Sequence, residues 1–277
     1  MTAQWVAQDK VFLVTGGASG LGAKYAKIFL QLGAKNVAVL DIAEAVGKTF
    51  VASLNEKYPV KAMFIKCDVS KEDEIKTAFQ QVLDANKRID VIINNAGIFN
   101  DSPHLWRTAS DVNWQGVVSF TLKGMEHMRK DKGGTGGTII NISSAAALLK
   151  CPSFPMYCGA KLAVLHFGQT LSVPPFFDRT GIRILTICIG PTLTPIVDNL
   201  HERSLDTTLV ETYLKTIDDP RLYQRIDSAV TAFVKMFQEG EPGSIWLSIN
   251  NKPGIDITSD INQAFDEFKM KCDLRAL

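Results

Sequence analysis

The chain has 277 residues, of which 46% are hydrophobic and 21% charged, a composition typical of folded globular proteins. Because 30 basic and 29 acidic residues nearly cancel and no basic stripe is present, we expect no nucleic-acid partner. No signal-peptide pattern and no run of ~18 apolar residues is found, which predicts a cytoplasmic protein without a membrane span. The five cysteines lack CxxC spacing, so we expect reduced thiols and no metal site.

Short apolar runs alternate with longer helical patterns along the chain. Near-continuous apolar runs are typical of strands that helices cover on both faces. The alternation predicts one α/β domain over residues 1–277, with a Rossmann-like, doubly wound parallel sheet of about seven strands. The predicted strands are 11–15, 37–41, 62–66, 90–94, 138–143, 182–188 and 244–249, and the predicted crossover helices are 20–32, 70–86, 108–130, 156–172 and 222–238.

Two local signals mark helix ends. Gly33 suits the C-terminal cap of the first helix. Pro174 and Pro175 fall inside the helical pattern that begins at 156, and an interior proline costs about 3 kcal/mol, so this helix should stop or kink near Val173.

A glycine-rich segment, TGGASGLG at 15–22, lies between the first strand and the first helix. Such a turn lets the backbone approach a pyrophosphate at the helix N-terminus. Asp41 ends the second strand, where a carboxylate can bind the ribose hydroxyls of NAD and repel the extra phosphate of NADP. Alternatively, Asp41 caps the helical segment that starts at Ala43. Lys24 could attract a 2′-phosphate, so NADP remains the second choice.

Tyr157 and Lys161 are four residues apart, which places both side chains on one face of a helix. A neighbouring cation favours the phenolate and lowers the tyrosine pKa, which makes proton exchange with an alcohol oxygen feasible. The pair follows the fifth strand, which ends in Ser143 and Ser144, so these groups could meet at the carboxyl edge of the sheet.

These motifs in this order resemble the short-chain dehydrogenase/reductase family, and the resemblance covers nearly all of residues 8–250. It implies a catalytic set of Asn113, Ser144, Tyr157 and Lys161. Ser144 would polarise the substrate oxygen, Tyr157 would exchange its proton, Lys161 would lower the tyrosine pKa, and Asn113 would hold a relay water. Ser144 is preferred to Ser143 because it lies thirteen residues before the tyrosine, as in the family. The alternative for Ser143 is packing or strand hydrogen bonding.

The resemblance also implies a set of cofactor contacts. Asp68 and Val69 would contact the adenine, residues 94–97 would form the cofactor wall, and Thr194 would bind the nicotinamide carboxamide. The full set expected for NAD is Gly16, Ser19, Gly20, Leu21, Gly22, Asp41, Ile42, Asp68, Val69, Asn95, Ala96, Gly97, Tyr157, Lys161 and Thr194.

Within the family, the chain resembles the NAD-linked 15-hydroxyprostaglandin dehydrogenases and the insect-type alcohol dehydrogenases. Where the prostaglandin enzymes have a substrate-contacting Gln, this chain has Phe154, which favours an apolar substrate beside Ser144 and Tyr157. We expect the cleft to be formed partly by 190–220 and 250–277, and the substrate to be a hydrophobic, secondary alcohol or its ketone. A homodimer or homotetramer is implied, its geometry left open by Pro174 and Pro175.

Two other functions are compatible with the same motifs. One is an NADP-dependent carbonyl reductase of the same fold, which tighter NADP binding would reveal. The other is a non-catalytic NAD-binding protein, against which the complete set of four catalytic side chains argues.

Overall fold

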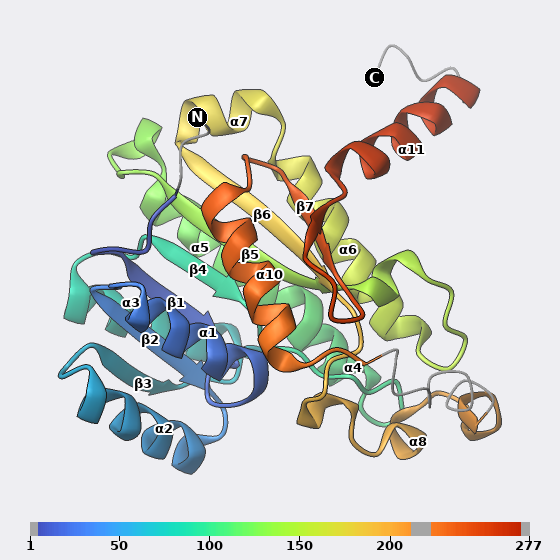
Figure 1. The fold of residues 1–277 in the computed structure, drawn as a ribbon, viewed down its shortest axis with the longest axis horizontal. Coiled ribbons are helices and arrows are strands. Elements are labelled where there is room, and N and C mark those ends of the chain that lie inside the picture. Colours follow the sequence, from blue (N-terminus) through green and yellow to red (C-terminus); the bar gives the residue numbers. More distant parts are fainter. Residues whose placement is uncertain (1–4, 212–222, 273–277) are drawn as a thin grey trace.

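The computed structural model describes residues 5–211 and 223–272 and contains one eight-stranded sheet in the order β3-β2-β1-β4-β5-β6-β7-β8 (Figure 1). Neighbouring strands from β1 to β7 are parallel, as predicted. The strands are β1 Val11–Thr15, β2 Asn36–Asp41, β3 Ala62–Lys66, β4 Val91–Asn94, β5 Gly137–Ser144, β6 Ile182–Ile189, β7 Ile245–Ser248 and β8 Ile255–Asp256. The predicted α/β class is confirmed, and all seven predicted strands form.

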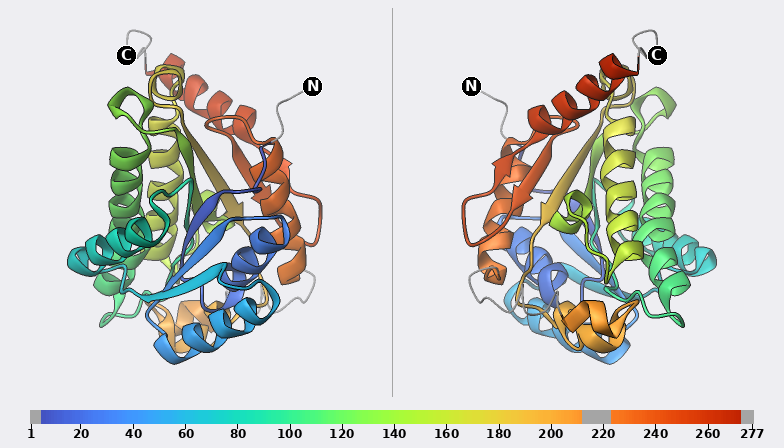
Figure 2. Two further views of the ribbon diagram at one scale, coloured as in Figure 1. Left: turned by 90° about the vertical axis from the view of Figure 1, so that its left-hand side faces the viewer. Right: turned by 90° about the vertical axis from the view of Figure 1, so that its right-hand side faces the viewer.

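Helices cover both faces of this sheet, which Figure 2 shows nearly edge-on. They are α1 Gly20–Gln31, α2 Glu44–Lys57, α3 Glu72–Asn86, α4 Trp106–Ser110, α5 Gly116–Met128, α6 Pro155–Leu171, α7 Pro174–Thr180, α8 Leu200–Arg203, α10 Ile226–Glu239 and α11 Thr258–Lys271. Shorter turns are the π-helix η1 Asp111–Gln115 and the 3-10 turns η2 Lys130–Lys132, η3 Ala145–Leu148 and η4 Pro195–Val197. None of the helices in the described ranges is long and apolar enough to cross a membrane.

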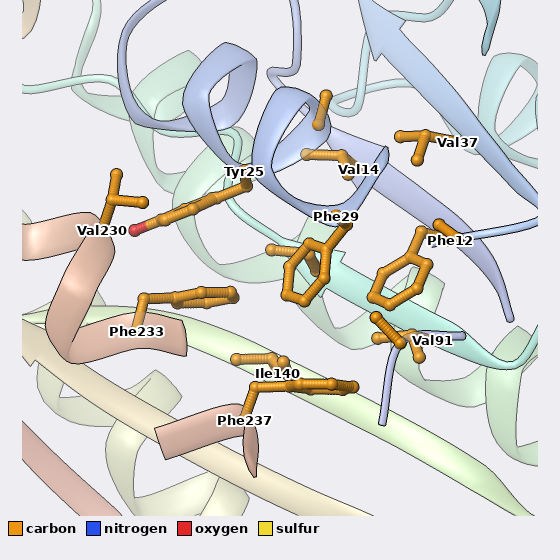
Figure 3. Close-up of a cluster of buried hydrophobic side chains, with 14 of the residues drawn as sticks. Phe12, Val14, Tyr25, Phe29, Val37, Val91, Ile140, Val230, Phe233 and Phe237 are labelled. Carbon is orange, nitrogen blue, oxygen red and sulfur yellow. The ribbon is translucent and has the colours of Figure 1, made fainter. Parts of the chain in front are cut away.

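Alternate residues of β1 point into two separate cores, which explains the unbroken apolar runs of the central strands. Phe12 and Val14 pack with α1, α2 and α10, whereas Val11 and Leu13 pack with α3 and α5. On the first face the aromatic rings of α1 and α10 interlock over β1 (Figure 3), with the centroids of Tyr25 and Phe233 3.9 Å apart. This packing fixes α1 against the sheet and hence the position of its N-terminus.

The proline pair ends one helix and begins the next, which confirms the predicted interruption. α6 stops at Leu171, and Pro174 and Pro175 occupy the first turn of α7. A proline is tolerated there because first-turn N–H groups have no intrahelical acceptor.

The C-terminal part of the sheet differs from the prediction of seven parallel strands, because β8 adds a short antiparallel edge to β7. Asn250 and Asn251 both have positive φ values of 55° and 56°, and Lys252 N–H donates to the Ile249 carbonyl. Two central residues in the left-handed conformation are typical of the type I′ turn that connects the strands of a hairpin, and Asn adopts this conformation readily. α11 follows and was not predicted.

Candidate active site

A cavity of about 810 Å³ lies at the carboxyl ends of the strands, beside the point where the strand order reverses between β1 and β4. Most of the predicted site residues line it together. They are Gly16, Ser19, Gly20, Leu21, Asp41, Ile42, Asp68, Val69, Asn95, Ala96, Gly97, Ser144, Tyr157, Lys161 and Thr194. Gly22, Asn113 and Phe154 are not among the lining residues.

The glycine-rich loop approaches the backbone after β4 too closely for larger residues. A Cβ on Gly16 would lie 2.8 Å from the Ala96 Cα, and Gly16 has a φ of 61°. The Asn95 amide donates to the carbonyls of Thr15 and Gly16, at 2.9 and 3.0 Å. The loop is therefore held open in front of the α1 N-terminus, which fits a dinucleotide pyrophosphate.

Gly22 supports this loop from behind. A Cβ there would lie 2.2 Å from the Gly16 carbonyl oxygen and 2.6 Å from the Asn95 amide nitrogen. We expect Gly22→Ala to weaken NAD binding at least about 10-fold, because a displaced loop loses oriented backbone N–H groups. Titration calorimetry with NAD measures this change. Gly159→Ala is the matched control, since its Cβ would meet no atom within 4 Å; an unchanged affinity in Gly22→Ala would contradict the expectation.

The Asp41 carboxylate links the glycine-rich loop to the segment that precedes α2. Its carboxylate accepts the Ala43 N–H at 2.9 Å, next to the start of α2, and the Ala18 N–H of the glycine-rich loop at 3.0 Å. It also lines the cavity beside the exposed Ile42. Lys24, the candidate for a 2′-phosphate, forms an ion pair with Asp227 at 3.1 Å and does not line the cavity.

The two serines at the end of β5 differ in their contacts. Ser143 is buried and donates to the Lys161 carbonyl at 2.8 Å, which is a structural role. Ser144 Oγ accepts the Ala146 N–H at 3.1 Å and donates to the Ile189 carbonyl at 3.2 Å, and its interaction with Tyr157 lowers the pKa of the tyrosine. Ser144 is therefore the serine that faces the tyrosine.

Tyr157 and Lys161 line the cavity from α6 although only 8% and 4% of their surfaces are exposed. Burial raises the pKa of Tyr157 to about 12, against the hydrogen bond with Ser144, which lowers it. Burial lowers the pKa of Lys161 to about 8. The ammonium donates to the Ile142 carbonyl at 2.9 Å and lies 5.7 Å from the centroid of the tyrosine ring. A positive charge bound in the cavity would oppose this effect of burial and favour the Tyr157 phenolate.

Asn113 lies in the π-helix η1, between α4 and α5. Its side chain receives the Ile98 N–H at 2.9 Å and donates to the Ile98 carbonyl at 2.7 Å. A Cβ on Gly97 would lie 3.2 Å from Asn113 Oδ1 and 3.5 Å from Lys161 Nζ. Asn113 and Lys161 thus both lie next to Gly97.

The structure places Phe154 behind the cavity wall instead of on it, contrary to the expected substrate contact. Its side chain is fully buried and packs against Phe99, with ring centroids 4.3 Å apart. Phe154 is the N-cap of α6, and its side chain packs in a buried cluster with Leu200 and Val210. Phe99 lines the cavity instead, and its ring stacks on that of Tyr157 with the centroids 4.2 Å apart.

Of the two segments expected to form the cleft, 190–220 contributes to the cavity wall and the described part of 250–277 does not. Gly190 and residues as far as Arg203 contribute to the cavity wall, as does Tyr223. The rest of 190–220 includes 212–220, which are outside the described residues. α11 lies next to α6, where Phe265 stacks on His166 at 5.3 Å, and the described residues after 250 do not line the cavity.

A doubly wound sheet with a glycine-rich loop at its switch point defines a dinucleotide-binding α/β protein. The chain belongs to the short-chain dehydrogenase family, whose model matches residues 10–205, and is therefore an oxidoreductase of that family. It is 36% identical over 194 residues to 15-hydroxyprostaglandin dehydrogenase (NAD(+)) of Rattus norvegicus, covering 70% of this chain and 72% of the relative. It is 34% identical over 198 residues to alcohol dehydrogenase 2 of Ceratitis capitata, covering 70% and 74%.

Solved structures share the fold. A short-chain type dehydrogenase/reductase from Mycobacterium marinum superimposes with a TM-score of 0.74 at 21% identity, covering 88% of this chain and 95% of that one. An NADPH-dependent 3-quinuclidinone reductase from Rhodotorula rubra superimposes with a TM-score of 0.73 at 22% identity, covering 89% and 92%.

Proposed function

We propose that the protein is an NAD-dependent dehydrogenase that oxidises a hydrophobic, secondary alcohol to its ketone. The observation that carries the proposal is the placement of Ser144, Tyr157 and Lys161 on one cavity wall, in the same cavity as the glycine-rich loop. A proton acceptor, a hydrogen-bonding hydroxyl and a buried cation are what removal of a proton from an alcohol requires.

Each side chain has a role that its surroundings support. NAD, when bound, supplies the group that accepts the hydride. Ser144 holds the substrate oxygen, and Tyr157, as phenolate, takes the hydroxyl proton. Lys161 favours the phenolate by its charge. Asn113 is retained as the fourth member, because it fixes the backbone at Ile98 and lies beside Gly97 and Lys161.

The preference for NAD rests on Asp41. Its carboxylate lines the cavity at the end of β2 and would repel a phosphate on the adjacent ribose oxygen. Lys24, the alternative contact for that phosphate, is paired with Asp227. The rat relative is named for NAD(+), which agrees with this assignment.

The substrate class follows from the wall beyond Tyr157. Phe99, Leu149, Ile196, Val197 and Leu200 line this part of the cavity and offer mostly apolar surface. Such a wall favours a substrate whose hydroxyl is flanked by hydrocarbon, with Ser144 and Tyr157 supplying the polar contacts. We therefore propose secondary alcohols with apolar chains or rings.

A turnover screen tests the proposal: NAD reduction is followed at 340 nm with a panel of apolar secondary alcohols, and repeated with NADP. We expect turnover with NAD and a kcat/KM for NAD above that for NADP. Asp41→Asn keeps acceptor oxygen at Ala18 but removes the charge, and should reduce this ratio about 10- to 100-fold, equivalent to about 1–3 kcal/mol. Lys24→Ala, outside the cavity, should leave the ratio unchanged.

The same screen separates the alternatives. NAD binding without turnover of any alcohol would favour a non-catalytic NAD-binding protein. Faster turnover with NADP, or an unaltered ratio in Asp41→Asn, would favour the NADP-dependent carbonyl reductase.

A further inference from the structure

The loop after β4 contacts Asn113 through Ile98 and Tyr157 through Phe99. Ile98 exchanges two hydrogen bonds with the Asn113 side chain, as described above. One residue further on, the Phe99 ring stacks on the Tyr157 ring with an interplanar angle of 29°. Two residues beyond Phe99, Asp101 reaches the backbone at the start of α6. Residues 98–101 thus connect η1 to the helix that carries Tyr157 and Lys161.

Asp101 is the least expected member of this loop, because only 1% of its surface is exposed. One carboxylate oxygen accepts the Met156 N–H at 2.7 Å, and the other accepts the Tyr157 N–H at 3.0 Å. These two donors lie in the first turn of α6, where no intrahelical acceptor exists. The Asp101 N–H itself donates to the Arg203 carbonyl at 2.7 Å, which ties the carboxylate to the end of α8 on the cavity wall.

No Lys or Arg of the described ranges forms an ion pair with Asp101. Its charge is instead balanced by the two backbone N–H groups and the positive end of the α6 dipole. The carboxylate is thus a fixed negative charge beside the tyrosine that would accept the proton. A neutral side chain at this position would weaken the acceptor of these two N–H groups, and a displaced one would leave them without it. Either change would alter the electrostatic field at Tyr157.

We propose that Asp101 is a positioning residue of the reaction. It fixes the Tyr157 end of α6, and its negative charge opposes formation of the Tyr157 phenolate. This proposal rests on the proposed dehydrogenase function. Asp101 touches neither the cofactor nor the substrate in this assignment and acts through the backbone of α6. Its role accounts for a buried carboxylate that the dehydrogenase motifs leave unexplained.

The field at Tyr157 gives the proposal a signature that a purely structural role would lack. Burial is the main cause of the raised pKa of Tyr157, and the charge of Asp101 raises this pKa further. Burial also raises the pKa of Asp101 itself. Lys161 is the cation of the same cluster. Removing the Asp101 charge should therefore lower the pKa of Tyr157, so that the rise of kcat/KM with pH begins at lower pH.

The test compares Asp101→Asn, Asp101→Glu and the unmodified protein in NAD-dependent oxidation of an alcohol from the screen. Asp101→Asn should lower kcat roughly 10- to 100-fold, change the Kd for NAD by less than about 2-fold, and move the kcat/KM midpoint down by roughly 0.5 pH units or more. Asp101→Glu keeps the charge and should retain the original midpoint with a reduced kcat. Asp84→Asn removes an exposed carboxylate from α3 and should change none of these values.

Amide hydrogen exchange provides a readout that needs no turnover. The Met156 and Tyr157 amides should exchange faster in Asp101→Asn, because their acceptor is weakened. Unchanged kcat, midpoint and exchange would overturn the role of Asp101, and so would a shifted midpoint in Asp101→Glu equal to that in Asp101→Asn. If Asp101→Asn does not fold, the Asp101→Glu midpoint and exchange rates decide. Absence of turnover in the unmodified protein refutes the dehydrogenase function instead.

Discussion

Tyr157→Phe should lower kcat for alcohol oxidation by about 10³-fold or more while leaving the Kd for NAD within a few-fold of its original value. General-base catalysis contributes typically 10²–10⁴-fold, and phenylalanine keeps the ring that stacks on Phe99 but has no proton acceptor. The loss should fall on kcat because the hydroxyl acts in the proton transfer. Steady-state kinetics with saturating NAD, together with calorimetric titration of NAD, measures both quantities.

The matched control is Tyr58→Phe, which removes a hydroxyl from the C-terminal end of α2, far from the cavity lining. It should leave kcat unchanged. Turnover by Tyr157→Phe at more than about a tenth of the original rate would show that another group accepts the proton. In that case the assignment of the base would be wrong, even though the cofactor assignment could still be right.

Lys161→Met should abolish most activity and at the same time stabilise the unliganded protein. Only 4% of the Lys161 surface is exposed, and its ammonium donates a hydrogen bond to the neutral Ile142 carbonyl. Burying a cation without an acidic partner is costly. Burial lowers the pKa of Lys161 to about 8, which corresponds to a destabilisation on the order of 1–3 kcal/mol at neutral pH. Methionine fills similar space without charge.

The stability gained by Lys161→Met should decrease as the pH rises above about 8. Below about pH 8 the lysine is protonated in both the folded and the unfolded chain, so the whole penalty acts on the folded protein. Between that pH and the ordinary lysine pKa of about 10.4, the unfolded chain holds more protons at this site, so the stability of the unmodified protein rises with pH. The difference in free energy of unfolding between Lys161→Met and the unmodified protein should therefore be largest below pH 8 and smaller at higher pH.

Thermal unfolding of both proteins without NAD, at pH 7 and pH 9.5, measures this difference. We expect Lys161→Met to unfold a few degrees higher at pH 7 and kcat/KM to fall roughly 10²-fold or more. Lys27→Met, an exposed substitution on α1, should change neither value appreciably. A lower melting temperature for Lys161→Met at pH 7 would show that the buried ammonium stabilises the fold.

The sequence alone determined the fold class and the order of the elements. Unbroken apolar runs between longer helical patterns are typical of strands buried on both faces, and the two cores on either side of β1 confirm this interpretation. The stop near Val173 followed from the missing N–H of proline. The cofactor loop and the Tyr157 and Lys161 pair could be located because glycine tolerance and helical spacing are local properties, and parallel strand ends meet at one edge.

The tertiary structure decided what depends on contacts between distant segments. Phe154 and Phe99 are both apolar, and only the packing of α6 onto the loop after β4 puts Phe99 on the cavity wall and Phe154 behind it. The role of Asp101 was invisible because its acceptor oxygens serve N–H groups 55 and 56 residues away. β8 depends on pairing with β7, because two residues are too few to show a strand period. The position of α11 depends on packing beside α6.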